Sequence, residues 1–231
     1  MTADTSLLES LPVSLTEFTI FEEVMDGFSF GHLTLDVEQQ PRVSLGLSLA
    51  RMSQRLQHFS ASFAIDARHF FQPFSREAST TSVEVADDWV WAKLETLALT
   101  SKLLTSPRQS EEDINHLLEA ASLAVRRMPR LHTMEIWNGN GDEHACLFRY
   151  SYDPDSRTAS LTWKGTWTIG ITRRTARSWR RTVRQRTGVA AEIQIEEIYI
   201  PRPFMTEAVA RLLYLRDRVA TKRVSRFLPL C

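Results

Sequence analysis

The sequence is poor in cysteine, glycine and long apolar runs, and neither sign of charge is in excess. Its only cysteines are Cys146 and Cys231, too few for the disulfide framework of a small secreted protein, so both are predicted to be free thiols. No apolar run approaches the roughly 18 residues that a membrane-spanning helix needs, and residues 1–10 lack the features of a secretory signal. These absences predict a cytoplasmic or nuclear protein with no membrane segment.

The shortage of glycine also argues against common cofactor sites. Only eight glycines occur, and neither the dinucleotide-binding motif nor the nucleoside-triphosphate motif is present. The six histidines form no close pair at metal-ligand spacing. Nothing around Cys146 supports a nucleophile, so we interpret it as a half-buried strand cysteine. We therefore expect a non-enzymatic protein with no cofactor, no metal and no catalytic residue.

The charge balance gives no general reason for binding to polyanions. Lysine plus arginine and aspartate plus glutamate each number 28. A neutral chain has no wide positive field to attract nucleic acid or an anionic membrane, so such binding would need a local patch.

One pattern does recur, Leu-x-x-φ-x-φ, where φ is mostly apolar. Its copies begin at Leu15, Leu56, Leu94 and Leu131, at steps of 41, 38 and 37 residues. The last two apolar positions of each copy lie two residues apart, as in a strand whose alternate side chains enter a core. Residues 44–55 and 114–125, before two of the copies, carry apolar residues at helical spacing.

Helix followed by strand, repeated along a chain, is typical of parallel strands joined by helical crossovers. For residues 1–137 we predict an α/β fold in the form of an irregular leucine-rich-repeat-like solenoid. The repeat is longer than the usual span of roughly 20 to 29 residues. An ordinary α/β sheet whose strands share a six-residue pattern is the alternative.

Residues 138–231 follow a different rhythm. Segments 144–152 and 158–167 flank a turn at Asp153-Pro154-Asp155-Ser156 and predict a β-hairpin insertion. A basic helix over 172–187, a strand over 190–200 and a terminal helix near 206–220 complete a C-terminal α/β segment, packed with the repeats as one continuous domain. The hairpin is rich in aromatic residues, which we interpret as cross-strand packing rather than a ligand cage: Phe148, Tyr150, Tyr152, Trp163 and Trp167.

Several segments together resemble a known but uncharacterised family. They lie at residues 15–23, 63–71, 91–101, 128–139, 145–150 and 161–167. They resemble the C-terminal domain that accompanies an F-box in many filamentous-fungal proteins, and the resemblance covers about residues 11 to 170. It implies the substrate-recognition part of a ubiquitin-ligase adaptor, with an unknown protein client and no catalytic residues. In that family a helical F-box of some tens of residues precedes the repeats, whereas the first strand predicted here begins by Leu15. We therefore do not expect this chain to bind the ligase linker protein.

The strand pattern itself nominates an interaction surface, because outward positions of successive repeat strands form a ladder. The candidate contact residues are Glu17, His58, Thr96 and Thr133, then Thr19, Ser60, Ala98 and Glu135, then Phe21, Ser62, Thr100 and Trp137. We expect Trp137 to be the anchor, since tryptophan often contributes a large share of binding energy.

A second candidate surface is a stretch of seven arginines without an acid. The residues that fall along one side of the expected helix are Arg173, Arg177, Arg180, Arg181 and Arg184. They would suit phosphates or an acidic partner, although we favour pairing with Glu192, Glu196 and Glu197 of the next strand, and we expect nucleic acid to bind weakly at most. Two other interpretations of the whole chain stay open. One is an accessory enzyme or small-molecule-binding protein of a fungal metabolic pathway, and the other is a truncated gene product.

Overall fold

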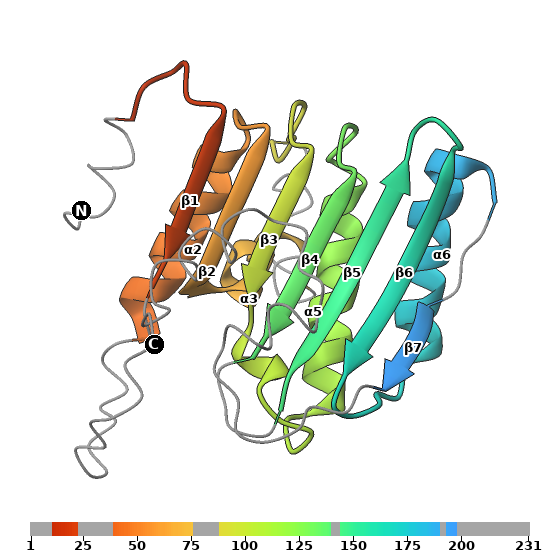
Figure 1. Ribbon diagram of the computed structural model, residues 1–231. Helices are drawn as coiled ribbons and strands as arrows, with labels where there is room; N and C mark the ends of the chain where they lie inside the picture. Colours follow the sequence, from red (N-terminus) through yellow and green to blue (C-terminus); the bar gives the residue numbers. More distant parts are fainter. Residues whose placement is uncertain (1–10, 23–38, 76–87, 140–143, 190–192, 198–231) are drawn as a thin grey trace, which may run out of the picture.

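A seven-stranded sheet organises the protein in the computed structural model, which describes residues 11–22, 39–75, 88–139, 144–189 and 193–197. The strands lie side by side in chain order, from β1 to β7 (Figure 1). Four parallel strands come first: β1 (Glu17–Phe21), β2 (His58–Asp66), β3 (Thr96–Thr100) and β4 (Thr133–Asn138). The mixed α/β class predicted from the sequence is confirmed.

The predicted β-hairpin is confirmed and extends this sheet. Strands β5 (Cys146–Asp153) and β6 (Thr158–Gly165) pair antiparallel to each other, and β5 pairs antiparallel to β4. Strand β7 (Ile193–Glu197) then runs parallel to β6, within the predicted strand at 190–200. The predicted terminal helix near 206–220 lies outside the described residues.

The helices cover one face of the sheet (Figure 1). They are α2 (Gln39–Ser53), α3 (Ala67–Phe70), α5 (Glu111–Val125) and α6 (Arg173–Thr187), with short 3-10 turns η2 (Gln72–Phe74) and η3 (Lys102–Leu104). Helix α2 begins before the predicted 44–55, and the proline at position 41 falls in its first turn, where a missing N–H costs no hydrogen bond.

Local sequence sets the ends of α5 and α6. The Ser110 hydroxyl accepts a hydrogen bond from the Asp113 N–H at 3.2 Å. Three acids occupy the first turn of α5, where their negative charges interact favourably with the positive end of the helix dipole. The Thr172 hydroxyl caps α6 by accepting from the Thr175 N–H at 3.2 Å. Helix α6 ends at Gly188, whose φ of 77° is the left-handed conformation that glycine adopts without strain.

The hydrophobic core lies between the sheet and the helices. A chain of rings, spaced by 5.6 to 6.2 Å, runs from Phe18 of β1 through Phe59, Phe70 and Trp91 to Trp89. A second group packs Trp179 of α6 against the hairpin rings at 5.1 and 5.8 Å. The prediction that the hairpin aromatics serve packing is confirmed for three wholly buried rings, Phe148, Tyr150 and Trp163.

Candidate functional site

The predicted ladder of strand positions exists as a register. The pairing of β1, β2, β3 and β4 aligns Glu17, His58, Thr96 and Thr133 in one rung, and Thr19, Ser60, Ala98 and Glu135 in the next. The third rung is interrupted, because Phe21 aligns with Ser62 but Thr100 aligns with Asp66 and Trp137. A bulge in β2 between Ala61 and Asp66 causes this shift.

The expectation that the ladder side chains are exposed is wrong for most of them. Ser60, Ala98, Thr100, Glu135 and Trp137 retain at most 3% of their accessible surface. Ser62 is equally buried, His58, Phe21, Thr96 and Thr133 are half-buried, and only Glu17 and Thr19 are exposed. Trp137 is therefore unavailable as a surface anchor.

Interactions across the ladder face account for part of this burial. The bulge turns Phe63 over the sheet, and its ring makes edge contacts with Phe21 at 5.7 Å and with Trp137 at 5.3 Å. The Glu135 carboxylate accepts from Arg149 Nε and Nη2 of β5, each at 2.7 Å. The His58 ring nitrogen Nδ1 lies 3.0 Å from the Thr96 hydroxyl. These contacts engage ladder residues within the sheet instead of presenting them to a partner.

Polar residues at the ends of the strands connect neighbouring strands, and sequence reasoning missed them. The Asp66 carboxylate accepts from the Ser101 hydroxyl at 3.0 Å and from the Lys102 N–H at 2.9 Å. The Asn138 amide donates to the Ser101 carbonyl at 2.8 Å. A signal was present, because Ser101 and Asn138 occupy the same position relative to the leucine that opens their repeat.

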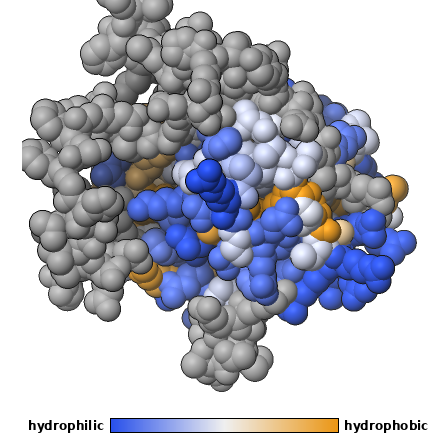
Figure 2. All heavy atoms as spheres, turned by 90° about the horizontal axis from the view of Figure 1, so that it is seen from below, coloured by the Kyte–Doolittle hydropathy of each residue, from blue (hydrophilic) through white to orange (hydrophobic). Residues whose placement is uncertain are grey.

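The predicted basic helix is α6, and its arginines divide into two groups. Thr175, Trp179, Thr182 and Val183 face inward and are buried. The five predicted arginines at 173, 177, 180, 181 and 184 are all exposed, and we call them the arginine surface. Strongly hydrophilic atoms gather on the side of the molecule that carries α6 (Figure 2).

Two other arginines of α6 serve packing instead. Arg174 Nε lies 3.0 Å from the Glu119 carboxylate of α5. Arg186 donates to the Leu131 carbonyl at 2.6 Å and to the Met128 carbonyl, with its guanidinium over the Tyr152 ring at 5.3 Å. The helix is thus held to α5 and the hairpin by partners that leave the arginine surface uncovered.

The arginine surface has few neutralising partners among the described residues. Arg173, Arg177, Arg181 and Arg184 form no ion pair within the described part of the chain. Glu192 and the side chains of Glu196 and Glu197, their expected partners, lie outside the described residues. Arg126, the residue after α5, adds a further cation nearby. Burial lowers its pKa, and the charge of the neighbouring Arg181 lowers it further.

The described residues offer little for metal or thiol chemistry. No group of three or more His, Cys, Asp or Glu side chains in them is placed to hold a metal ion. Cys146 is wholly rather than half buried, and burial raises the pKa of its thiol well above the usual value. A protonated, enclosed thiol is a poor nucleophile. Among the described helices, none combines the length and apolar character needed to cross a bilayer.

Comparison with protein families gives one match, which extends over residues 10–221. The chain belongs to the family of unknown function DUF6546. The comparisons found no matching curated protein and no matching solved structure. The DUF6546 match covers the segments that carry the resemblance described above, but its description does not mention F-box proteins. That association therefore stays a prediction.

Proposed function

We propose that this DUF6546 chain is a non-enzymatic protein-interaction module, and that its arginine surface binds an acidic segment of a partner protein. The observation that carries the proposal is the arginine surface itself: exposed cations along one face of a helix that contains no acid. In a chain of zero net charge, such a concentration of one sign is a local feature that favours a local partner.

The spacing of the cations favours a helical acidic segment. Arg173, Arg177, Arg181 and Arg184 follow one another at three- or four-residue steps, so their Cβ atoms lie about 5–6 Å apart. Carboxylates at the same steps on a partner helix would have the same spacing. Guanidinium groups suit this contact because they bind carboxylates through two parallel hydrogen bonds.

A protein partner is favoured over nucleic acid by what the helix lacks on its exposed side. Its only aromatic residue, Trp179, is wholly buried, so α6 offers no ring on which bases could stack. The neutral chain also provides no extended field to assist phosphate contacts.

The wider context of this proposal is the F-box resemblance. The order of β1 to β4, parallel and sequential with helices on one face, supports our proposal of an irregular leucine-rich-repeat-like solenoid. In that setting the client of a recognition domain would dock on the arginine surface instead of the buried ladder, in the cytoplasm or nucleus.

The test is a binding titration of the purified chain. The probe is a labelled helical peptide with glutamate at every third or fourth position, and the matched peptide has glutamine instead. We expect the glutamate peptide alone to bind by fluorescence anisotropy at about 150 mM salt, with affinity falling as salt rises. Arg177→Gln, Arg181→Gln and Arg184→Gln combined should weaken binding about tenfold.

A control variant separates this surface from net charge. Lys93→Gln, Arg108→Gln and Arg157→Gln together remove the same charge from exposed positions elsewhere. This triple variant should retain the parent affinity. Equal losses in both variants, or tighter binding of a duplex DNA of about 20 base pairs than of the glutamate peptide, would contradict the proposal.

A further inference from the structure

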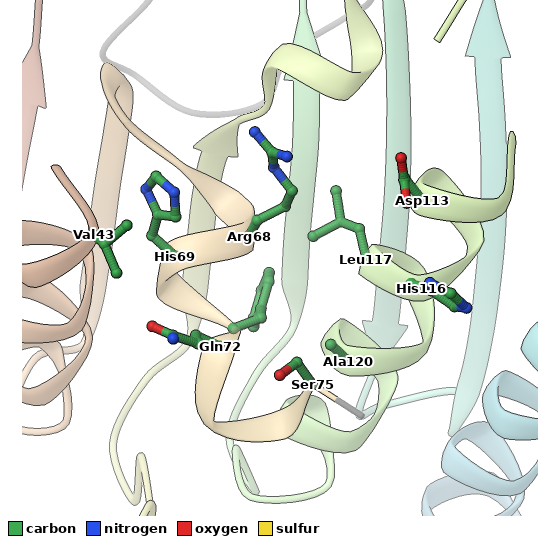
Figure 3. A pocket seen from close by; sticks show the side chains of 10 residues that line it. Val43, Arg68, His69, Gln72, Ser75, Asp113, His116, Leu117 and Ala120 are labelled. Carbon is green, nitrogen blue, oxygen red and sulfur yellow. The ribbon is translucent and has the colours of Figure 1, made fainter. Parts of the chain in front are cut away.

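An open cleft lies on the helical side of the molecule, away from the arginine surface. It is bounded by α3 and η2 on one side and by α5 on the other (Figure 3). Its volume is about 380 Å³, within the range of small-molecule sites. Phe71, Leu117 and Ala120 are buried residues in its lining, and Val43 of α2 adds a half-buried apolar contact. An apolar ligand body would therefore find complementary walls.

Close packing of α2 against α3 positions His69 on one wall. A Cβ added to Gly46 of α2 would lie only 2.4 Å from the His69 Cβ, so this approach requires glycine. The close approach fixes the backbone of α3 beside α2 and leaves His69 in the lining of the cleft.

The His69 ring lines the cleft and, when neutral, can offer one hydrogen-bond donor. Its Nδ1 is buried and has no hydrogen-bond partner. A proton on Nδ1 would be a buried donor without an acceptor, which is costlier than leaving a bare ring nitrogen there. The proton of the neutral ring therefore belongs on Nε2. Burial lowers the pKa of His69, and the charges of Arg68 and Lys102 lower it further against the opposing charge of Asp66, so the ring is neutral near pH 7.

Arg68 supplies a cation on the same wall, with three of its five N–H donors uncommitted among the described residues. Its Nε and Nη2 donate to the two Asp66 oxygens at 3.2 and 3.3 Å, which fixes the guanidinium plane. The Nη1 hydrogens and the second hydrogen of Nη2 have no partner in the described part of the chain. That free edge has the geometry that receives a carboxylate through two hydrogen bonds.

Gln72 adds a further donor at the mouth of this wall. Its side chain is exposed and its amide makes no hydrogen bond within the described residues. The donor side chains of Arg68, His69 and Gln72 thus lie on the α3 and η2 side. Asp113 and His116 line the opposite wall, on α5 (Figure 3).

From this arrangement we propose that the cleft binds a small carboxylate with an apolar body, its carboxylate on Arg68 and His69 and its body against Phe71, Leu117 and Ala120. This site goes beyond the proposed interaction function and shares no residue with the arginine surface.

Benzoate and benzamide are the probes, since they have the same shape and differ in charge. Ligand-observed NMR titration of the full chain should show benzoate binding in the millimolar range, as expected for so small a ligand, and benzamide binding at least about fivefold more weakly. Arg68→Lys keeps the charge and loses the paired donors, and it should weaken benzoate at least about fivefold. The arginine-surface triple variant should bind benzoate as the parent does.

A second variant keeps the test decisive if Arg68→Lys disturbs the fold, which thermal melting will report. Ala120→Leu narrows the cleft without changing any charge and should reduce affinity for both probes. The proposal is overturned if benzoate does not bind, if benzamide binds equally well, or if both folded cleft variants keep the parent affinity. It is also overturned if the arginine-surface variant abolishes benzoate binding, because the ion would then sit on α6.

Discussion

At the scale of single residues, Phe63 packs on the face of the sheet that carries the ladder residues. Its φ of 61° is a left-handed conformation that costs a phenylalanine about 1–2 kcal/mol, so surrounding contacts must hold it there. The Thr100 hydroxyl accepts from its N–H at 2.7 Å, and its ring lies against Phe21 and Trp137. The ladder residues Phe21 and Trp137 consequently pack against the Phe63 ring and do not form a free surface.

Trp137→Ala should accordingly lower stability. The side chain is 2% exposed, and truncation of a buried tryptophan leaves a cavity that costs about 3–5 kcal/mol. Urea unfolding followed by circular dichroism measures the loss. Val90→Ala, at a residue that is 44% exposed, is the control and should change stability little. A Trp137→Ala protein with parent stability would show that Phe63 does not rest on a packed tryptophan.

Asp66 is the residue that most closely links structure to pH. Burial alone would raise the pKa of its carboxyl, but the Arg68 charge and the hydrogen bonds from Arg68 and Lys102 outweigh burial, so its pKa lies below the ordinary 3.8. A carboxyl whose pKa is lower in the folded chain stabilises it above the unfolded pKa. This contribution is lost as pH falls from about 5 through the folded pKa.

Asp66→Asn should therefore have two effects. It should lower the free energy of unfolding by about 1–3 kcal/mol near pH 7, because a buried, charge-assisted network loses an acceptor. It should also flatten the acid dependence, so that urea unfolding at about pH 7 and pH 3 differs less than in the parent chain. Parallel curves for the two proteins would mean that Asp66 has an ordinary pKa in the fold.

At the scale of elements, α6 shows what sequence can and cannot predict. Arginines at helical spacing predicted the helix and its exposed face. Its polar contacts with α5 were not predictable: the Ser178 and Ser122 hydroxyls lie 2.5 Å apart, and Arg126 donates to the Thr182 hydroxyl at 2.9 Å. Such pairs have no periodic signature in a single sequence.

Gly188→Ala isolates the contribution of the helix end. An added Cβ at this position meets nothing within 4 Å, so no clash contributes and only the left-handed backbone resists alanine. We expect a loss of about 1–2 kcal/mol in the free energy of unfolding. Gly188→Asn is the matched variant and should lose less, since asparagine tolerates this conformation better. Equal losses for both would point to a cause other than backbone strain.

The strands were also predictable in part. The spacing of leucine and apolar residues predicted β1 to β4 and the register of their first two rungs. Successive side chains of a strand point to opposite faces, so apolar residues recur at every second position. The β2 bulge could not be predicted, since it depends on where the Phe63 ring finds partners in β1 and β4. The open cleft was missed for the same reason: Arg68, His69 and Gln72 become neighbours of α5 only through the packing of separate repeats.

At the scale of the whole molecule, the seven strands make one sheet and the buried apolar residues of both sequence segments make one cluster. Met134 and Ile136 from residues 1–137, and Phe148 and Trp163 from residues 138–231, belong to the same core. Strand β4 pairs with β5 over its whole length, so the chain has no natural break at position 137. These features predict one cooperative unfolding unit.

Leu97→Ala tests that cooperativity from one side of the sheet. Leu97 is 1% exposed in β3, and its truncation should cost about 2–5 kcal/mol through lost burial and the cavity left behind. If the chain unfolds as one unit, the most protected amides anywhere in it exchange only through global unfolding. Hydrogen exchange followed by mass spectrometry should then show equal losses of protection free energy in the slowest peptides of β3, of the β5–β6 hairpin and of α6. If residues 146–187 keep the protection of the parent chain and only the peptides around β3 lose it, the chain instead divides into two domains near residue 137.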